Sequence, residues 1–581
     1  ELYPKNGDQM WESYKSYSAK HRTEYDDTFV RDSIERTHHI AFDRCEDFLP
    51  DSTVRLPEFV VPEGKTAIQA LTSDALAGMK EKNITDPEYV DRLKYELNII
   101  KERGFAQYFL TMKAISDKAQ EEMLVGLGRG SAAGSLLSYV LDITQIDPIK
   151  YALQFERFLT KGGKGYPDID FDVEEPMELK QQLAEEWAKI GVNVVPISNF
   201  NTLQLRSLIK DIGKFYDIPF TEVNKVTGVM MSEATPLAKK AHGQTAGVYT
   251  PTFEEVKKYS ETLQAFFEKY PEVATHVDHL FGNMRSISRH AGGVVVAENL
   301  DKHMPLINSG GVIQTPWSEG QNVRHLEPLG FIKFDLLGLS TLRMISGAIR
   351  HILKRHQGIE EPTFEQVRDY YNTNLHPDTI DFDNQEVWRE VFHKGKWAGI
   401  FQMTNGGAQR FCQEAQPTSL LDFAAVTAIF RPGPLSAKAH SLYVANKNNP
   451  SQVHYEHPII KEVLGETHNL LVFQEQLAML AHKLGDNISL DEGNMLRKVL
   501  TKKGTGKGGI KTKLYNKFVK GCNKHGLSEE VAKNLWAKME FFSGYGFNLS
   551  HAVSYGAVSF QCAWLSHYYP VEWMAAFLDK E

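Results

Sequence analysis

The chain has 581 residues, with 65 Lys and Arg against 74 Asp and Glu, for a formal charge of −9. This length predicts several domains of ordinary globular composition, and the acidic balance argues weakly against a nucleic-acid binder. Four widely spaced cysteines without a CxxC pair exclude a disulfide framework or a cysteine-rich zinc site. No apolar run reaches the roughly 18 residues of a membrane span, so we expect a cytoplasmic protein with reduced thiols.

The first half of the chain predicts helices around a few short strands. Residues 1 to about 60 are polar and interrupted by prolines, so we expect irregular structure there. Residues 66–121 predict helices, including an amphipathic run from Pro87 to Arg103. A short apolar run at 123–125 stops at glycines, and a helical pattern follows from 131 to 141.

The second half predicts a helical insertion, two strands and a large helical region. Residues 200–285 are helical in pattern, with charges at i,i+4 spacing. Glycine-bounded runs at 292–296 and 330–335 predict short strands. Beyond residue 340 the pattern is mostly helical, with breaks at 431–434 and near 504. The expected fold class is therefore α+β.

Carboxylates alternate with apolar residues from Tyr166 to Asp172. In a strand, side chains two apart share a face, so Asp168, Asp170 and Asp172 are expected to project together. Neighbouring carboxylates repel each other, and oxygen ligands of this kind suit Mg²⁺. A solvated edge strand or a turn is the alternative for this segment alone.

A lone carboxylate, Asp335, interrupts the apolar strand-like run 331–338. Burying it is costly without a partner, so we expect either a metal ligand or a residue bonded to backbone. A strand with two carboxylates beside a strand with a third is the layout that two-metal phosphoryl transfer requires. Adjacency of the two strands is a prediction, because sequence spacing does not establish it.

The segment 125–135 is a glycine loop that runs into a predicted helix start. Glycines and free N–H groups at a helix start favour a bound anion, and Arg129 and Ser131 add phosphate donors. No GKS or GKT follows, so it is not a P-loop. Gly128, Gly130 and Ala133 fit a loose dinucleotide fingerprint, and a plain glycine turn is the further alternative.

A basic segment extends from Arg497 to Lys524, with ten Lys and Arg residues and no Asp or Glu. The rest of the chain therefore carries −19, so the average conceals a basic segment in an acidic body. Glycines make its middle flexible, and a flexible segment of one sign suits polyanion binding. A solvated charged face is the alternative.

The glycine loop and both Asp segments occur in one order with five further motifs: 155–159 (FERFL), 290–295 (HAGGVV), 430–434 (FRPGP), 473–476 (FQEQ) and 544–551 (GYGFNLSH). From about residue 60 to its end, the chain resembles the alpha subunit of the replicative DNA polymerase III, the family C polymerases of bacteria or bacteriophages. The resemblance implies a nucleotidyltransferase-like (polymerase beta-like) palm, a helical thumb and helical fingers. We expect an N-terminal extension at 1–49, palm at 50–198 and 289–340, thumb at 199–288 and fingers at 341–581.

The resemblance also implies roles for individual residues. Asp168, Asp170 and Asp335 match metal ligands for two Mg²⁺ ions, with Mn²⁺ as a substitute, whereas Asp172 matches a carboxylate usually not assigned as a ligand. Residues matching triphosphate-binding positions are Arg129, Gly130, Ser131, Lys333, Arg497, Lys498, Lys502 and Lys503. Positions beside the incoming sugar are matched by Ser550 and His551, and DNA- or primer-binding positions by His290 and Arg431. Two structural alternatives are a carboxylate pair for Lys333 and a helix-capping role for His551.

The function implied is template-directed DNA synthesis, in which a primer 3′-OH attacks the α-phosphate of a dNTP and pyrophosphate leaves. The expected partners are primer-template DNA and dNTPs, with other replisome proteins bound through parts absent from this chain. The family's phosphoesterase-like, clamp-binding and oligonucleotide-binding regions are not found, and Glu1 replaces an initiator Met, so we expect a processed or excised polymerase core. Alternatives are a catalytically silent DNA-binding scaffold of the same fold and a dinucleotide-dependent enzyme built on residues 126–135.

Overall fold

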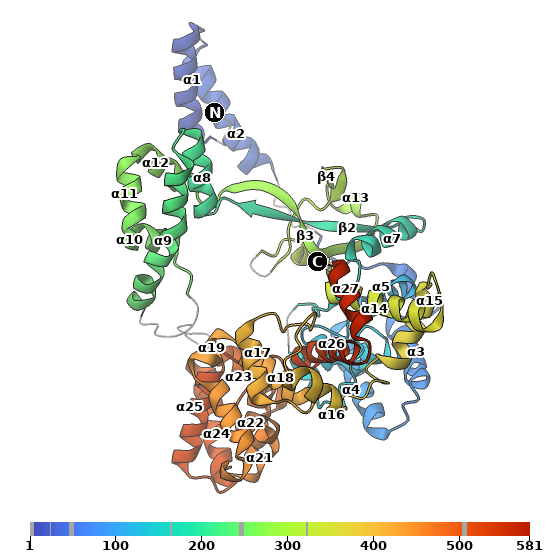
Figure 1. The fold of residues 1–581 in the computed structure, drawn as a ribbon. Coiled ribbons are helices and arrows are strands. Elements are labelled where there is room, and N and C mark those ends of the chain that lie inside the picture. Colours follow the sequence, from blue (N-terminus) through green and yellow to red (C-terminus); the bar gives the residue numbers. More distant parts are fainter. Residues whose placement is uncertain are drawn as a thin grey trace. The chain divides into compact units, whose positions relative to one another are not determined.

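The structure is a computed structural model (Figure 1) that describes residues 5–23, 25–45, 51–162, 165–242, 249–320, 323–501 and 508–580. The side chains of Lys498, Thr501 and Gly508 are not among those described. Within it the chain divides into two compact units, residues 1–53 and residues 54–581. No helix of the described residues is long and apolar enough to span a membrane.

The first unit consists of helices, and the prediction of irregular structure there is wrong. It contains α1 (Gly7–His21), α2 (Asp27–His39) and a π-helical turn (Ile40–Arg44). Asn6 and Gln9 form a reciprocal capping box at the start of α1, and the Asp26 carboxylate caps α2. The prolines that suggested irregularity all follow these helices, so they do not interrupt them.

The second unit is built on a four-stranded sheet of order β1-β6-β3-β2. Its strands are β1 (Asp170–Val173), β2 (Val192–Thr202), β3 (Met284–Glu298) and β6 (Lys333–Gly338). β1 and β6 are parallel and place Asp170 beside Asp335, whereas the other pairs are antiparallel. The predicted adjacency of the two Asp-bearing strands is confirmed.

The first Asp strand is shorter than predicted. β1 begins at Asp170, and Asp168 lies in the extended segment before it. Pro167 has no N–H for a ladder, and the Ile169 N–H donates to the Tyr108 hydroxyl (3.3 Å) instead of a strand. The alternation of faces nevertheless continues through this segment, because Ile169 and Phe171 are both buried in the apolar core.

One face of the sheet packs on helices, and the other carries the acids. The helical side is formed by α3 (Ala67–Glu81), α4 (Pro87–Arg103), α5 (Ala106–Glu122) and α7 (Pro176–Ala188). Phe334 and Leu336 of β6 point into this core, so Asp335 between them faces the opposite side. The helices predicted for 66–121 are confirmed, and α4 has the predicted bounds.

The helix predicted at 131–141 is present only as two short pieces. The chain forms a 3₁₀ turn (Ala132–Gly134) and then the short α6 (Leu136–Val140). The buried Glu96 carboxylate accepts the N–H groups of Leu136 and Leu137, both at 2.9 Å. Because this acid occupies the helix start, those N–H groups are not available to an anion.

The glycine loop also lacks the topology of a dinucleotide-binding unit. Val125, the first residue of the loop, forms an antiparallel bridge with Val173 at the edge of β1. A dinucleotide fingerprint requires a parallel strand that leads through the loop into a long helix. Within the described residues neither feature occurs at this loop, so the dinucleotide alternative is wrong.

The insertion predicted at 200–285 is helical, but its ends are strands. Its helices are α8 (Leu205–Phe215), α9 (Phe220–Ala241), α10 (Phe253–Tyr259), α11 (Glu261–Lys269) and α12 (Pro271–Leu280), with an apolar core of their own. β2 runs on to Thr202 and β3 starts at Met284, so a two-stranded ribbon leads to these helices (Figure 1).

The region after β3 begins with α13 (Leu300–His303) and a small hairpin of β4 (Ile307–Ser309) and β5 (Val312–Gln314). Beyond residue 340 it is mostly helical, as predicted. The helices are α14 (Ser340–Gln357), α15 (Phe364–Asn374), α16 (Gln385–Val387), α17 (Gly406–Ala415), α18 (Leu420–Ile429), α19 (Pro432–Ser436), α20 (Ala439–Asn448), α21 (Pro458–Leu464), α22 (Gln474–Leu484), α23 (Leu490–Thr501), α24 (Gly508–Lys524), α25 (Glu529–Phe542), α26 (Leu549–Tyr568) and α27 (Pro570–Lys580). The break predicted at 431–434 coincides with the end of α18 at Ile429 and the first residues of α19, and the one near 504 falls outside the described residues.

Candidate active site

Three carboxylates converge on the face of the sheet opposite the helical core. Oxygen atoms of Asp168, Asp170 and Asp335 all lie within 4.8 Å of one another. The β1–β6 register brings Asp170 beside Asp335, and the extended segment before β1 adds Asp168. We name these three residues the acid cluster.

The acid cluster is electrostatically unbalanced. Burial raises the pKa of Asp170 to about 6, and the charges of Asp168 and Asp335 add to this effect. Burial and the charge of Asp335 likewise raise the pKa of Asp168. The Oδ1 atom of Asp335 is buried and has no hydrogen-bond partner among the described residues. Converging carboxylates and an oxygen without a donor fit a divalent cation such as Mg²⁺.

The acid cluster borders a cavity of about 440 Å³. Other charged residues that line the cavity are Glu319, Arg324, Glu327 and Lys333. Arg324 pairs with Glu327 (2.9 Å), and its charge lowers the pKa of Asp168 against the larger effect of burial. The cavity thus gives solvent and small molecules access to the acid cluster.

Lys333 is the basic residue closest to the acid cluster. Its Nζ lies 2.7 Å from Oδ2 of Asp335, so the expected alternative of a carboxylate pair does occur. Gly293 of β3 is the cross-strand neighbour of Asp335. A Cβ atom there would lie 3.2 Å from the Lys333 side chain and 3.0 Å from the His290 ring, so the glycine leaves room for both.

His290 lies beside the acid cluster in a neutral form. Its Nδ1 accepts the N–H groups of Gly292 (3.2 Å) and Gly293 (2.7 Å), and therefore carries no proton. Burial lowers the pKa of His290, although Asp335 opposes this shift. The 3.9 Å approach of Nδ1 to Asp335 Oδ1 is consequently not an ion pair.

The glycine loop meets the start of α26 next to the acid cluster. The Gly130 N–H donates to Nδ1 of His551 (3.2 Å), and the Ser550 hydroxyl donates to the Gly130 carbonyl (3.2 Å). Asn548 caps α26, so the expected capping alternative for His551 is not observed. Burial, together with the charge of Arg129, lowers the pKa of His551 to about 4, and the ring is neutral at physiological pH.

Arg129 faces the carboxylates of β1. Its Nη1 lies 3.2 Å from Asp172 Oδ1, and its Nε lies 3.8 Å from Asp170 Oδ2. Ser131 follows at the start of the 3₁₀ turn and is half-buried. The structure therefore brings Arg129, Lys333 and the Gly130–His551 contact to one acidic face.

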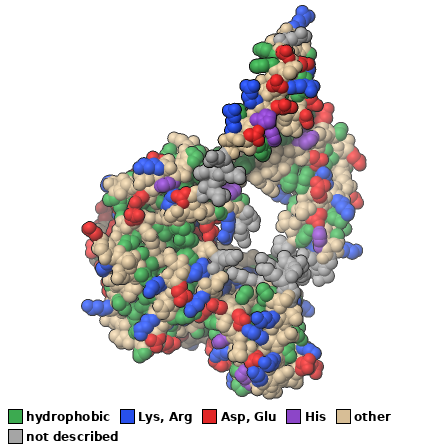
Figure 2. Space-filling view, turned by 180° about the vertical axis from the view of Figure 1, so that it is seen from behind, with side chains coloured by type: hydrophobic (Ala, Val, Ile, Leu, Met, Phe, Trp, Pro, Cys, Tyr) green, Lys and Arg blue, Asp and Glu red, His purple; other side chains and the backbone are tan. Residues whose placement is uncertain are grey.

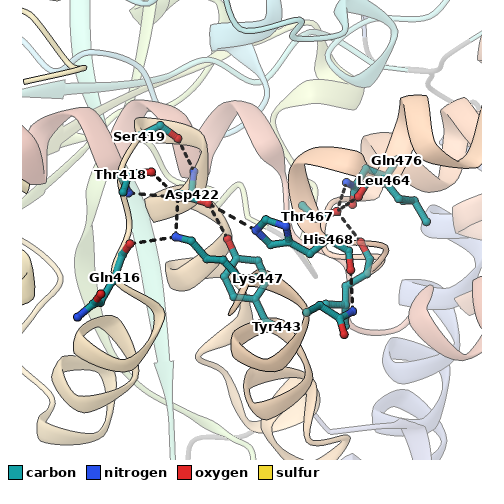
Figure 3. A network of polar contacts seen from close by, with 12 residues as sticks. Gln416, Thr418, Ser419, Asp422, Tyr443, Lys447, Leu464, Thr467, His468 and Gln476 are labelled. Carbon is teal, nitrogen blue, oxygen red and sulfur yellow. Dashed lines mark hydrogen bonds and ion pairs between the residues drawn. The ribbon is translucent and has the colours of Figure 1, made fainter. Parts of the chain in front are cut away.

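Arg431 lies between α18 and α19 and is held through backbone contacts. Its guanidinium donates to the carbonyl of Tyr545 and lies 4.6 Å from the centroid of the Phe547 ring. The flanking helices α18 and α20 are joined by Asp422, which accepts hydrogen bonds from Lys447 (2.7 Å) and Tyr443 (3.0 Å), as Figure 3 shows. Arg431 is not part of the acid cluster.

Acidic residues from outside the basic segment pair with several of its lysines. Lys517 pairs with Glu492 (2.9 Å), and Lys520 and Lys524 pair with Asp486 (2.7 and 2.6 Å). On the face seen in Figure 2, basic and acidic side chains are intermixed over the described surface. Burial, with the charge of Arg157, lowers the pKa of Arg497 to about 10. Lys502, Lys503 and the side chain of Lys498 lie outside the described residues.

Two residues at the site carried no assigned role in the sequence analysis. Tyr555 donates to the Asp172 carboxylate (2.9 Å), and Glu475 accepts the N–H of Leu549 at the start of α26 (3.0 Å). Glu475 lies in the motif 473–476, and Tyr555 is one helical turn beyond His551. Sequence reasoning could have found Glu475 through its motif. It could have found Tyr555 through its spacing from His551, because residues four apart on a helix share a face.

Comparison with known proteins places this mixed α/β chain in a polymerase family. A family model described as the bacterial DNA polymerase III alpha NTPase domain matches residues 66–338, and one described as the bacterial DNA polymerase III alpha subunit finger domain matches residues 355–526. The chain belongs to the bacterial DNA polymerase III alpha subunit family.

Individual relatives agree with this assignment. The chain is similar to the DNA polymerase III subunit alpha of Bacillus subtilis, with 31% identity over 93% of this chain and 45% of that protein. It is 30% identical to that of Aquifex aeolicus, over 92% and 46%, and 32% identical to that of Mycobacterium tuberculosis, over 90% and 43%. The chain thus spans about half the length of the curated relatives it matches.

Proposed function

We propose that this chain is a template-directed DNA polymerase core that adds dNTPs to a primer 3′-OH and releases pyrophosphate. The observation that carries the proposal is the acid cluster, in a chain whose relatives are named DNA polymerase III subunit alpha. In this proposal the sheet and its helices at 50–198 and 289–340 act as the palm. The insertion at 199–288 is the thumb, and 341–581 are the fingers.

Asp168, Asp170 and Asp335 would hold two Mg²⁺ ions. Bound metal supplies charge neutralisation at the phosphates and a lower pKa for the attacking hydroxyl. Holding Asp170 and Asp335 on paired strands, with Asp168 in the segment that leads into β1, fixes the oxygen atoms before substrate arrives, so little reorganisation is needed during the reaction. The raised pKa values of Asp168 and Asp170 are consistent with a site that a cation completes.

The other residues would bind and orient the substrates. Arg129 and Lys333 would hold the triphosphate in line with the 3′-OH, together with Gly130, Ser131 and the basic residues Arg497, Lys498, Lys502 and Lys503. His551, fixed by Gly130 and flanked by Ser550, would leave no room for a ribose 2′-OH. His290 and Arg431 would contact primer or template.

A primer-extension assay with Mg²⁺ and dNTPs tests the proposal. The wild-type chain is expected to extend a primed template, and Asp335→Asn to reduce extension by a factor on the order of 10³ or more while the protein stays folded. Asp369→Asn, an exposed acid on α15, is the matched control and should extend normally. No extension by the wild type would favour the silent DNA-binding scaffold. Near wild-type extension by Asp335→Asn would contradict the assigned site.

A further inference from the structure

A buried chain of hydrogen bonds connects α26 to the glycine loop. The Tyr555 hydroxyl donates to Asp172 Oδ2 (2.9 Å), and the Arg129 Nη1 donates to Asp172 Oδ1 (3.2 Å). Asp172 is only 3% exposed and Tyr555 9%. A buried carboxylate with a donor on each oxygen has a defined orientation, because losing either donor would leave a desolvated oxygen unpaired.

Asp172 is used differently from the other carboxylates of its segment. It shares a strand face with Asp170, yet it does not belong to the acid cluster. Its two oxygens are directed at Arg129 and Tyr555. The Gly126 N–H also donates to the Asp172 carbonyl (2.7 Å), which aligns the start of the glycine loop on the same residue.

Tyr555 is itself held rigidly. Its ring lies 4.2 Å from the His551 ring and 5.2 Å from the Phe401 ring, measured between centroids. His551 precedes it by one turn of α26 and accepts the Gly130 N–H. Successive turns of one helix therefore fix both the backbone of the loop, through His551, and the side chain of Arg129, through Asp172.

Arg129 retains the capacity to bind a ligand while it is held. Its side chain is 37% exposed, whereas that of Asp172 is 1% exposed. Within the described residues its side chain makes one hydrogen bond, to Asp172, and a guanidinium has five N–H groups. The planar group is thus hydrogen-bonded through Nη1, its Nε lies 3.8 Å from Asp170, and its remaining N–H groups are available for a ligand, the arrangement that suits recognition of a phosphate.

We propose that Asp172 and Tyr555 are positioning residues that hold Arg129 in the orientation in which it receives the triphosphate of the incoming nucleotide. This inference rests on the proposed function, since it requires Arg129 to bind that triphosphate. Removing either residue leaves the acid cluster in place and frees the guanidinium to rotate. The loss falls on nucleotide binding, not on the metal.

The test compares KM for dNTP, kcat and the Mg²⁺ concentration at half-maximal rate. Tyr555→Phe removes one hydroxyl and is expected to raise KM about fivefold, and Asp172→Asn to raise it about tenfold or more. Both variants should keep the Mg²⁺ dependence and most of kcat. In an Arg129→Ala background neither substitution should raise KM further, because the group they position is gone. Tyr89→Phe, which removes a Tyr–Asp hydrogen bond (2.6 Å to Asp147) of similar kind elsewhere, should leave KM unchanged.

Three results would overturn the inference. One is an unchanged KM in Tyr555→Phe, the variant that tests the idea if Asp172→Asn does not fold. Another is a shift in the Mg²⁺ dependence of Asp172→Asn without a change in KM, which would make Asp172 a metal ligand. The third is a full additional effect in the Arg129→Ala background. Binding of a labelled dNTP without primer separates the two proposals. A wild type that binds dNTP but does not extend primers contradicts only the proposed function. The dNTP affinities of Tyr555→Phe and Asp172→Asn relative to the wild type then test the inference.

Discussion

Two carboxylate sites in this molecule have opposite surroundings. Asp422, in the first turn of α18, accepts hydrogen bonds from Lys447 and Tyr443 of α20 and from the Thr418 N–H (Figure 3). Burial would raise its pKa, but the hydrogen bond and charge of Lys447 hold it below the usual value. In the acid cluster, by contrast, the pKa of Asp170 is raised to about 6.

The difference separates a structural role from a binding role. Asp422 finds its counter-charge and donors inside the protein, so it joins helices and needs nothing from solvent. The acid cluster sets three carboxylates against Lys333 and the more distant Arg129, with His290 neutral, and leaves Asp335 Oδ1 without a donor among the described residues. Unfavourable electrostatics that persist in a folded site are typical of ligand binding.

The largest effect on stability is expected at Asp422. Asp422→Asn leaves the mostly buried Lys447 without a counter-charge and should lower the free energy of unfolding by about 3 kcal/mol. Denaturant unfolding measures this change. Asp369→Asn serves as the control and should stay within about 0.5 kcal/mol of the wild type. An equally small loss of stability in Asp422→Asn and Asp369→Asn would contradict the structural role of Asp422.

Divalent cations should stabilise the protein through the acid cluster and not through Asp422. Mg²⁺ at ten times its dissociation constant is expected to raise the free energy of unfolding of the wild type by about 1.4 kcal/mol, because it binds the folded state. Asp335→Asn should lose this response, and Asp422→Asn should keep it. Thermal unfolding with Mg²⁺ and with EDTA gives the answer. A Mg²⁺ response that survives Asp335→Asn would place the cation elsewhere.

Removing a charge from the acid cluster should stabilise the metal-free protein. Asp170→Asn relieves repulsion by Asp168 and Asp335, so we expect a gain of about 1 kcal/mol at pH 7 in EDTA. This sign is opposite to that of Asp422→Asn. A destabilised Asp170→Asn variant under these conditions would show that the cluster is already balanced internally.

The smallest expected effect is the pH dependence of the stability differences between the wild type and the Asp170→Asn and Asp422→Asn variants. The pKa of Asp170 is raised from 3.8 to about 6, so its contribution to stability falls as pH rises from about 4 to about 6. The pKa of Asp422 is lowered, so its contribution is complete above about pH 4 and is lost as pH falls further. We expect the free energy of unfolding, measured in EDTA between pH 3 and pH 7, to show this. The difference between wild type and Asp170→Asn should change with pH in the opposite direction to the difference between wild type and Asp422→Asn. Parallel slopes would contradict the contrast.

Much of the candidate site could be predicted from the sequence because it depends on patterns within a few residues of each other. Alternation in the run 331–338 separates Asp335 from Phe334 and Leu336, whatever the sheet does around it. The same holds for α4, whose Asp86 cap and Pro87 start mark its first turn. Predictions failed where a distant residue decided the outcome. Glu96 takes the N–H groups that a longer helix after the glycine loop would have offered, and acids outside the basic segment neutralise part of it.

By itself, the sequence determined the family, most of the helices and the identity of the acids on each strand. Only the tertiary structure decided that Asp170 stands beside Asp335, that Asp172 turns to Arg129 and that Tyr555, 383 residues further along the chain, completes this contact. The physical reason is range. Face alternation and helix capping act within a few residues, whereas strand register and buried hydrogen bonds depend on how distant segments pack, which no local pattern records.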